Sequence, residues 1–302
     1  MFIFFSTLFF ILSAGVAQVW GYLLKSSEIA YVRTDTRDIY SMDVQRSISI
    51  PLIEHVVASS SLSWSQDGAS LAFTSGSNVL HILDVREGGV QDYVIDSVQL
   101  LEEPAWSPDN RYIAFHAPST IAYYRVYLLR LSDGAIFPLN DEDTTTVGAA
   151  WSPMMQGTAM QLAYQSLEPG CGWAIYVVEL QMDSDAAPQI GDVRRLTDCG
   201  YQNMRPEWSP DGQRIVYYAQ PLPGDTRVAV PPDIYVMDAN GDHVQRLTHN
   251  AAAFSPSWSA DGQQIVFTSS GECGAYLMNA DGSDLRCLSY DRFIDIHLAW
   301  RP

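Results

Sequence analysis

The residues best suited to binding chemistry in this sequence are Glu103, Arg205, Glu207 and His297. Each of them stands one or three positions before a tryptophan that recurs along the chain. One position before the tryptophans are Ser63, Ala105, Ala150, Glu207, Ser257 and Ala299, and three before are Ser61, Glu103, Gly148, Arg205, Ser255 and His297. Most of these residues are small, so the four ionisable ones stand out as a candidate site for a ligand or partner.

Motifs for covalent or metal-dependent catalysis are missing from the sequence. The stretch Gly68-Ala69-Ser70-Leu71-Ala72 lacks the last glycine of a serine-hydrolase nucleophile motif. There is no His-Glu-x-x-His, no Cys-x-x-Cys, and the six histidines lack metal-ligand spacing. Two Asp- and Asn-rich stretches, 238–242 and 279–284, resemble calcium loops, but the residue preferences of hairpin turns account for them without a metal. We therefore predict no catalytic residue, no metal and no cofactor.

A repeat built around the tryptophans must position these residues. Its markers are Trp64, Trp106, Trp151, Trp208 and Trp258, each followed by Ser, and a sixth, Trp300. Successive markers are 42, 45, 57, 50 and 42 residues apart. After the tryptophan strand come a tight turn, two further apolar strands and a closing strand, so each unit has four strands, here called a to d. This period and content are typical of one blade of a β-propeller, in which the repeated tryptophan packs between blades.

The two ends of the chain together supply one more blade. The segment after Lys25 begins at a b strand, 28–33, and the sequence ends on a tryptophan strand, 297–300. Pairing the two would close the ring and remove its free edges. The fold class expected is all-β, a six-bladed propeller over residues 25–302 closed by strands from both termini, with an amino-terminal apolar helix.

In such a ring the b–c and d–a loops open on one face, so the four ionisable residues should gather near one mouth of the central channel. Because side chains two apart share a face of a strand, Arg205 and Glu207 are expected to lie together. The hypothesis is that this mouth binds a ligand or partner. The alternative is a structural Arg–Glu pair among ordinary solvent-facing residues.

The four cysteines are Cys171, Cys199, Cys273 and Cys287. The first two fall in a b–c loop and in the d–a loop that leaves the same blade, so a disulfide between them is expected. The other two flank a c–d hairpin with an offset register, which makes a second bridge a weaker expectation. Buried free thiols are the alternative.

Residues 1–24 contain no charged side chain and indicate a targeting or anchoring segment. One interpretation is a signal peptide with a small-residue cleavage site at Gly15–Ala17, and the other is a retained membrane helix that tethers the protein. Both place the remainder outside the cytoplasm, periplasmic, secreted or membrane-anchored, where disulfides form. The net charge of −18 disfavours nucleic acid and anionic lipid as partners.

The segments 195–219 and 246–269, RLTDCGYQNMRPEWSPDGQRIVYYA and RLTHNAAAFSPSWSADGQQIVFTS, resemble the TolB-type WD40-like (PD40) propeller repeat. The resemblance covers about residues 28–302 and implies the propeller fold, but it is not specific for one activity. The function predicted first is a non-catalytic binding module of the cell envelope that engages a protein or glycan partner. The alternatives are a propeller-fold hydrolase or lyase with a cross-blade site, and a tethered envelope sensor.

Overall fold

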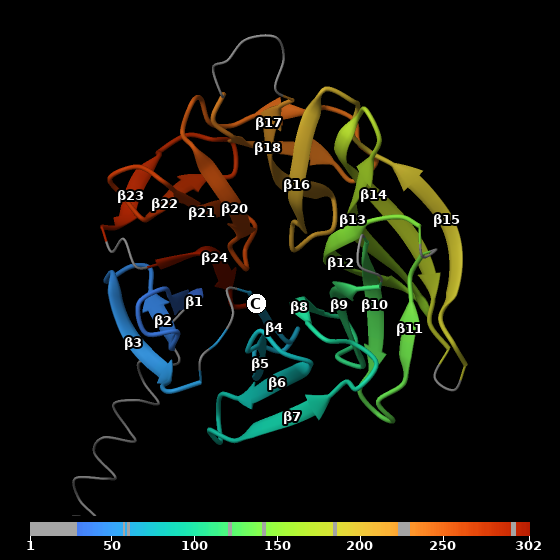
Figure 1. Cartoon of the computed structure of the whole chain (residues 1–302). Coiled ribbons are helices and arrows are strands. Elements are labelled where there is room, and N and C mark those ends of the chain that lie inside the picture. Colours follow the sequence, from blue (N-terminus) through green and yellow to red (C-terminus); the bar gives the residue numbers. More distant parts are fainter. Residues whose placement is uncertain are drawn as a thin grey trace, which may run out of the picture.

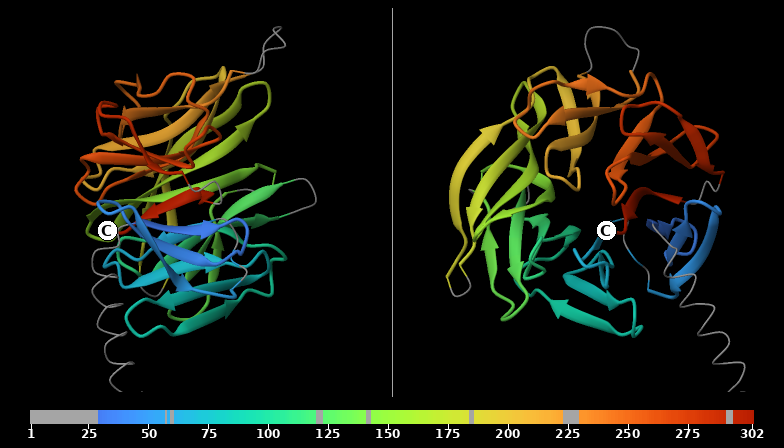
Figure 2. Two further views of the ribbon diagram at one scale, coloured as in Figure 1. Left: turned by 90° about the vertical axis from the view of Figure 1, so that its left-hand side faces the viewer. Right: turned by 180° about the vertical axis from the view of Figure 1, so that it is seen from behind.

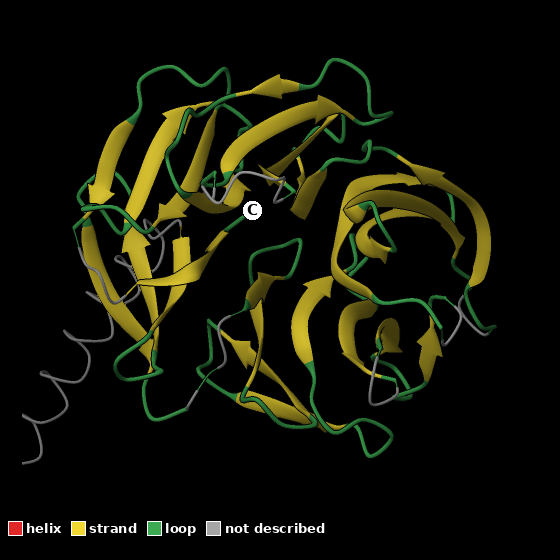
Figure 3. Ribbon diagram, turned by 45° about the horizontal axis from the view of Figure 1, so that its top comes forward, coloured by secondary structure: helices red, strands yellow, loops and turns green. Residues whose placement is uncertain are grey.

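The computed structural model describes residues 29–56, 58, 61–119, 123–140, 143–183, 186–222, 230–290 and 294–302. Every regular element within these ranges is a β-strand (Figure 3). No helix that could cross a membrane is found among them. The predicted apolar helix and the choice between signal peptide and anchor concern residues 1–24, which lie outside the described residues.

Twenty-four strands form six antiparallel four-stranded sheets arranged as a ring around one axis (Figure 1). Blade 1 contains β24 (Ile294–Trp300), β1 (Ile29–Arg33), β2 (Ile39–Asp43) and β3 (Ile48–Ile53), and blade 2 contains β4 (Leu62–Trp64), β5 (Ser70–Thr74), β6 (Val79–Asp84) and β7 (Val90–Val94). Blade 3 contains β8 (Glu102–Trp106), β9 (Tyr112–Pro118), β10 (Tyr124–Arg130) and β11 (Ile136–Pro138), and blade 4 contains β12 (Thr146–Gln156), β13 (Ala159–Glu168), β14 (Gly172–Gln181) and β15 (Gln189–Arg195). Blade 5 contains β16 (Tyr201–Trp208), β17 (Arg214–Pro221), β18 (Asp233–Asp238) and β19 (Gln245–Arg246), and blade 6 contains β20 (Ala253–Trp258), β21 (Gln264–Ser269), β22 (Ala275–Asn279) and β23 (Arg286–Ser289). The prediction of a six-bladed propeller is confirmed.

The ring is closed by strands from the two ends of the chain. The last strand, β24, pairs antiparallel with β1, so that Trp300 faces Ile29 and Ala299 faces Ala30. The strands β24, β4, β8, β12, β16 and β20 are the innermost of their blades, and each contacts the next around the ring. Figure 2 shows the same ring from its edge and from behind.

The core consists of six apolar clusters, one between each pair of neighbouring blades. The recurring tryptophans lie in these clusters or pack against them, which confirms their predicted role in inter-blade packing. Three of them also bond to the preceding blade. The indole N–H groups of Trp64, Trp151 and Trp208 donate to the carbonyls of Ala299, Ala105 and Ala150 at 3.1, 3.2 and 3.2 Å.

The serine after the tryptophan organises the turn that reverses the chain after the inner strand. In blade 5 the hydroxyl of Ser209 donates to Asp211 at 2.6 Å and accepts from the N–H of Arg214 at 2.9 Å. Gly212 in this turn has φ near +66°, a conformation that glycine adopts without cost. The same network recurs in blades 2, 3 and 6 at Ser65, Ser107 and Ser259. The inner strands therefore share one register relative to the axis.

Candidate functional site

A cavity of about 550 Å³ runs along the axis of the ring. Its walls are the six inner strands, from the position three before each tryptophan to the position two after it. All four residues predicted for the site, Glu103, Arg205, Glu207 and His297, line this cavity. The end of the cavity toward which the b–c and d–a loops open is here called the mouth.

The inner strands are not regular where they reach the mouth. Strands β8, β12, β16 and β20 each carry a register shift immediately before the tryptophan. The residue three before the tryptophan, Glu103, Gly148, Arg205 or Ser255, has φ between +45° and +62° in these strands. Such a β-bulge redirects the side chains that follow, so residues two apart no longer share a face.

For this reason Arg205 and Glu207 do not pair as the alternation of a regular strand would require. The guanidinium of Arg205 forms a close ion pair with Glu103 of blade 3. Glu207 instead points to the neighbouring blade 6, where its Oε1 accepts the N–H of Trp258 at 2.8 Å and the hydroxyl of Ser257 at 3.0 Å. The two ionisable residues of β16 thus contact two different blades: Arg205 contacts blade 3 and Glu207 contacts blade 6.

Glu207 performs a task that smaller residues perform elsewhere in the ring. The hydroxyl of Ser63 accepts the N–H of Trp106 at 3.1 Å, and the hydroxyl of Ser257 accepts the N–H of Trp300 at 3.4 Å. In both cases the serine that precedes the tryptophan of one blade accepts a hydrogen bond from the backbone of the tryptophan in the next blade. Burial raises the pKa of Glu207 to about 7 despite its two donors. Glu207 is therefore a link between blades 5 and 6 whose charge changes near neutral pH.

Glu103 is the ionised centre of the mouth. Burial would raise its pKa, but Arg205, His116 and His297 together hold the pKa of Glu103 below its usual value. The carboxylate is therefore charged at neutral pH. The structure pairs Glu103 with Arg205, places His297 in the wall of the same cavity, and directs Glu207 to blade 6.

Two residues at the mouth escaped the sequence reasoning. His116, on β9, lies between the carboxylates of Glu102 and Glu103, with its Nε2 3.5 Å from one and its Nδ1 3.6 Å from the other. His116 is buried and Glu102 is half-exposed. The sequence signal for these two residues was weak. His116 belongs to a b strand, and its place beside the inner strand follows from the register of β8 against β9, in which Glu102 pairs with His116.

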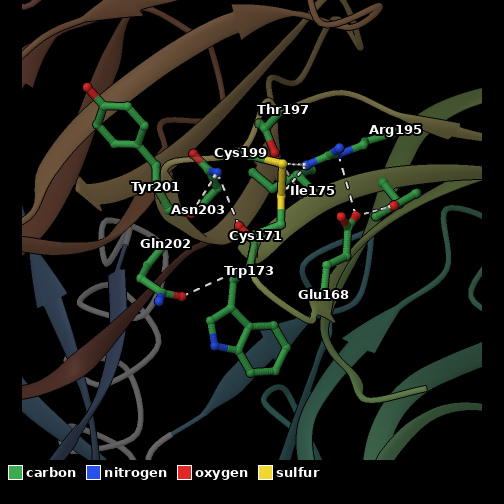
Figure 4. Close-up of a disulfide and its surroundings, with 11 residues drawn as sticks. Glu168, Cys171, Trp173, Ile175, Arg195, Thr197, Cys199, Tyr201, Gln202 and Asn203 are labelled. Atoms are coloured by element: carbon green, nitrogen blue, oxygen red, sulfur yellow. Dashed lines mark hydrogen bonds and ion pairs between the residues drawn. A yellow bond between two sulfur atoms is a disulfide. The ribbon is translucent and has the colours of Figure 1, made fainter. Parts of the chain in front are cut away.

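Both predicted disulfides are confirmed, Cys171–Cys199 and Cys273–Cys287. The first joins the b–c loop of blade 4 to the d–a loop between blades 4 and 5 (Figure 4). A guanidinium nitrogen of Arg195 lies 2.8 Å from the sulfur of Cys171, and Nε of Arg195 lies 3.5 Å from Glu168. Glu168 and the two sulfurs are the only His, Cys, Asp or Glu cluster among the described residues close enough to share a metal ion, but disulfide sulfurs are not available as thiolate ligands.

Comparison with known proteins supports the fold of the chain. No protein-family model matches the chain. A curated relative, the uncharacterized peptidase YuxL of Bacillus subtilis (strain 168), is 24% identical over 206 residues, which are 67% of this chain and 28% of that protein. Among solved structures the chain is similar to TolB from Acinetobacter baumannii (TM-score 0.67, 23% identity, 92% of this chain and 67% of that chain). It is also similar to a putative TolB from Agrobacterium tumefaciens (TM-score 0.64, 19% identity, 92% and 99%). The chain thus has the propeller fold of the TolB structures.

Proposed function

We propose that this chain is a TolB-type WD40-like propeller of the cell envelope, and that it binds a protein partner at the mouth of its axial cavity without catalysing a reaction. The observation that carries the proposal is the placement of charge. Small residues, prolines and tryptophans make up most of the cavity wall, while the Glu103–Arg205 ion pair and His297 line the end where the b–c and d–a loops open.

The loops around the mouth support a protein partner. Five exposed large apolar or aromatic residues lie in the b–c or d–a loops of this face or at the strand ends beside them: Tyr123, Leu167, Tyr201, Val230 and Tyr290. Tyrosines and aliphatic residues around a central polar group are typical of protein interfaces. A glycan would need an open aromatic plane, and four of the six inner-strand tryptophans are at most 8% exposed.

The placement outside the cytoplasm is part of the same proposal. Its support is the pair of disulfides, which form in oxidising compartments, together with the uncharged segment 1–24. The peptidase relative gives little support to the enzyme alternative, because the chain spans 28% of that protein. The serine of the incomplete hydrolase motif, Ser70, lies in β5, where its backbone N–H donates to the hydroxyl of Ser65, and not on a strand-to-helix turn.

The test is affinity capture from envelope extracts with the full chain and its Arg205→Ala variant as baits. The proposal predicts a co-purifying protein that the wild type retains and Arg205→Ala loses. The matched control is Arg286→Ala, since Arg286 is exposed at the c–d hairpin of blade 6 and lies away from the mouth. If Arg205→Ala and the wild type capture the partner equally well, the mouth is not the binding site. If the baits retain a glycan and no protein, the partner is a glycan.

A further inference from the structure

One side of the mouth holds buried polar atoms that no described residue satisfies with a hydrogen bond. They are Ser61 Oγ, Glu103 Oε2, His116 Nδ1 and Gln165 Oε1. Ser61, His116 and Gln165 are 6%, 5% and 1% exposed, so bulk solvent does not reach these side chains freely. Glu103 Oε2 and His116 Nδ1 lie 3.6 Å from each other, just beyond hydrogen-bond distance, and the other two atoms have no hydrogen-bond partner among the described residues. Because buried polar atoms in folded proteins are nearly always hydrogen-bonded, these atoms indicate a bound partner group.

These atoms come from three consecutive blades. Ser61 of blade 2 and Glu103 of blade 3 line the cavity at equivalent positions of their inner strands. The next equivalent position, in blade 4, is Gly148, and the amide of Gln165 occupies the space that a side chain there would fill, with its Nε2 1.6 Å from the position of a Cβ. His116 faces Glu103 from β9 at 3.6 Å. The four residues therefore come from three neighbouring blades on one side of the mouth, and this set is here called the arc.

The chemistry of the arc selects a donor. The carboxylate of Glu103 and the amide oxygen of Gln165 can only accept hydrogen bonds, and the hydroxyl of Ser61 can accept as well. Two carboxylates, Glu102 and Glu103, face this side, with His116 3.5 and 3.6 Å from them, and Arg205 is bound to the other oxygen of Glu103. A group with several N–H donors and a positive charge complements such a surface.

We propose that the arc formed by Ser61, Glu103, His116 and Gln165 receives a basic side chain, a guanidinium or ammonium group, which the partner protein inserts into the mouth. The net charge of −18 agrees with a basic partner segment and would speed its association. This inference rests on the proposed function, because it assigns the chemistry of the partner at the same mouth.

The probes are three synthetic pentapeptides, acetyl-Gly-Gly-Arg-Gly-Gly-amide and its citrulline and glutamate counterparts. Citrulline keeps the shape of arginine and removes its charge. Binding to the full chain is followed by NMR, through the imidazole signals of His116, and Kd values are taken from the titrations. We expect the arginine peptide to bind at least tenfold more tightly than the citrulline peptide and to shift the His116 signals. Equal binding of the two peptides would overturn the proposal.

Substitutions in the arc test whether the arginine peptide binds there. Glu103→Gln should weaken the arginine peptide at least tenfold, and Glu102→Gln, at a half-exposed position that the fold tolerates, should weaken it by a smaller factor. Glu87→Gln is the matched control on an exposed c–d hairpin of blade 2 and should leave Kd unchanged. Unchanged binding in both Glu102→Gln and Glu103→Gln would overturn the proposal. Spermidine binding as tightly as the arginine peptide would overturn the assignment to a polypeptide side chain.

The outcomes separate this inference from the function on which it rests. If captured protein depends on Arg205 but the arginine and citrulline peptides bind alike, the cationic group is wrong and the mouth remains the binding site. If the arginine peptide binds through Glu103 but no protein capture depends on Arg205, the cation site stands and the proposed protein-binding function fails.

Discussion

Glu103 and Arg205 form an ion pair that joins blade 3 to blade 5 across the intervening blade 4. The two residues occupy equivalent positions of their inner strands, and blade 4 has Gly148 at this position. Gly148 contributes no side chain between the carboxylate and the guanidinium, and the amide of Gln165 lies where one would be. The ion pair and the glycine are therefore parts of one arrangement.

Removal of Arg205 should destabilise the protein through Glu103. In Arg205→Met the carboxylate of Glu103 keeps its partly buried place without its counter-ion, so the free energy of unfolding should fall by about 1–3 kcal/mol. Adding Glu103→Gln to this variant should recover part of the loss, because it removes the unpaired charge. Urea denaturation of the two single variants and the double variant measures the coupling. Strictly additive losses would show that the pair does not contribute as a pair.

Gly148 should not tolerate alanine. A Cβ at residue 148 would lie 1.6 Å from Nε2 of Gln165, and the φ of +62° is unfavourable for any L side chain. Gly157 supplies a matched control, since it has φ of +66° and nothing within 4 Å of its Cβ position. We expect Gly157→Ala to lower the unfolding free energy by about 1 kcal/mol from the backbone alone, and Gly148→Ala to lower it by about 1–3 kcal/mol more from the clash. Thermal or urea unfolding of the two variants gives both values. Equal losses in both would mean that Gln165 moves aside without cost.

The fold could be predicted from the sequence because its signal is repeated. Six tryptophans at propeller spacing, the Ser–x–Asp–Gly turns and the unpaired strands at both ends all indicate the same ring. Each repeat is weak evidence alone, but every copy must satisfy the same inter-blade packing, so the copies reinforce one another. The disulfides were predictable for the same reason, since the order of strands places Cys171 and Cys199 in loops of one face.

The site was predictable in membership and not in geometry. Alignment on the tryptophans identified Glu103, Arg205, Glu207 and His297, and all four line the cavity. Their partners depend on the β-bulge at Glu103 and Arg205, and non-glycine residues with positive φ carry no clear mark in a sequence. His116 and Gln165 share one position of the repeat, three residues after the b-strand residue that pairs with the tryptophan. The alignment on the tryptophans compared positions of the a strands only and therefore did not include them.

The two disulfides should stabilise the fold by similar amounts. Cys171–Cys199 closes a sequence separation of 28 residues and Cys273–Cys287 one of 14. In the loop-entropy model each disulfide contributes about 3–4 kcal/mol to the unfolding free energy. The loop closed by Cys171–Cys199 is twice as long, which adds only about 0.6 kcal/mol. Paired serine variants, Cys171→Ser with Cys199→Ser and Cys273→Ser with Cys287→Ser, should therefore show nearly equal losses in urea denaturation. Complete reduction of the wild type by a thiol breaks both bridges and should give about the sum of the two losses. An unchanged urea midpoint after complete reduction would contradict the expectation.

Glu207 should make stability depend on pH near neutrality. Its folded pKa is raised to about 7, whereas an unfolded glutamate titrates near about 4.3. A carboxyl with a raised folded pKa favours the folded state when it is protonated, so this contribution is fully present below the unfolded pKa and is lost as pH rises through about 7. Glu207→Gln keeps an oxygen acceptor for Trp258 and Ser257 but cannot ionise. Relative to the variant, the wild type should therefore lose about 1–3 kcal/mol of unfolding free energy between pH 5 and pH 8.

The comparison isolates Glu207 because the other shifted carboxyl at the mouth acts in another range. The pKa of Glu103 is lowered, so its stabilising contribution is lost only as the pH falls below the usual range of a glutamate, outside the interval from pH 5 to pH 8. Glu87→Gln, at an exposed hairpin, controls for the general effect of removing one negative charge. If the stability difference between Glu207→Gln and the wild type is constant from pH 5 to pH 8, Glu207 does not titrate in the folded protein and its bond to blade 6 is maintained by an ordinary carboxylate.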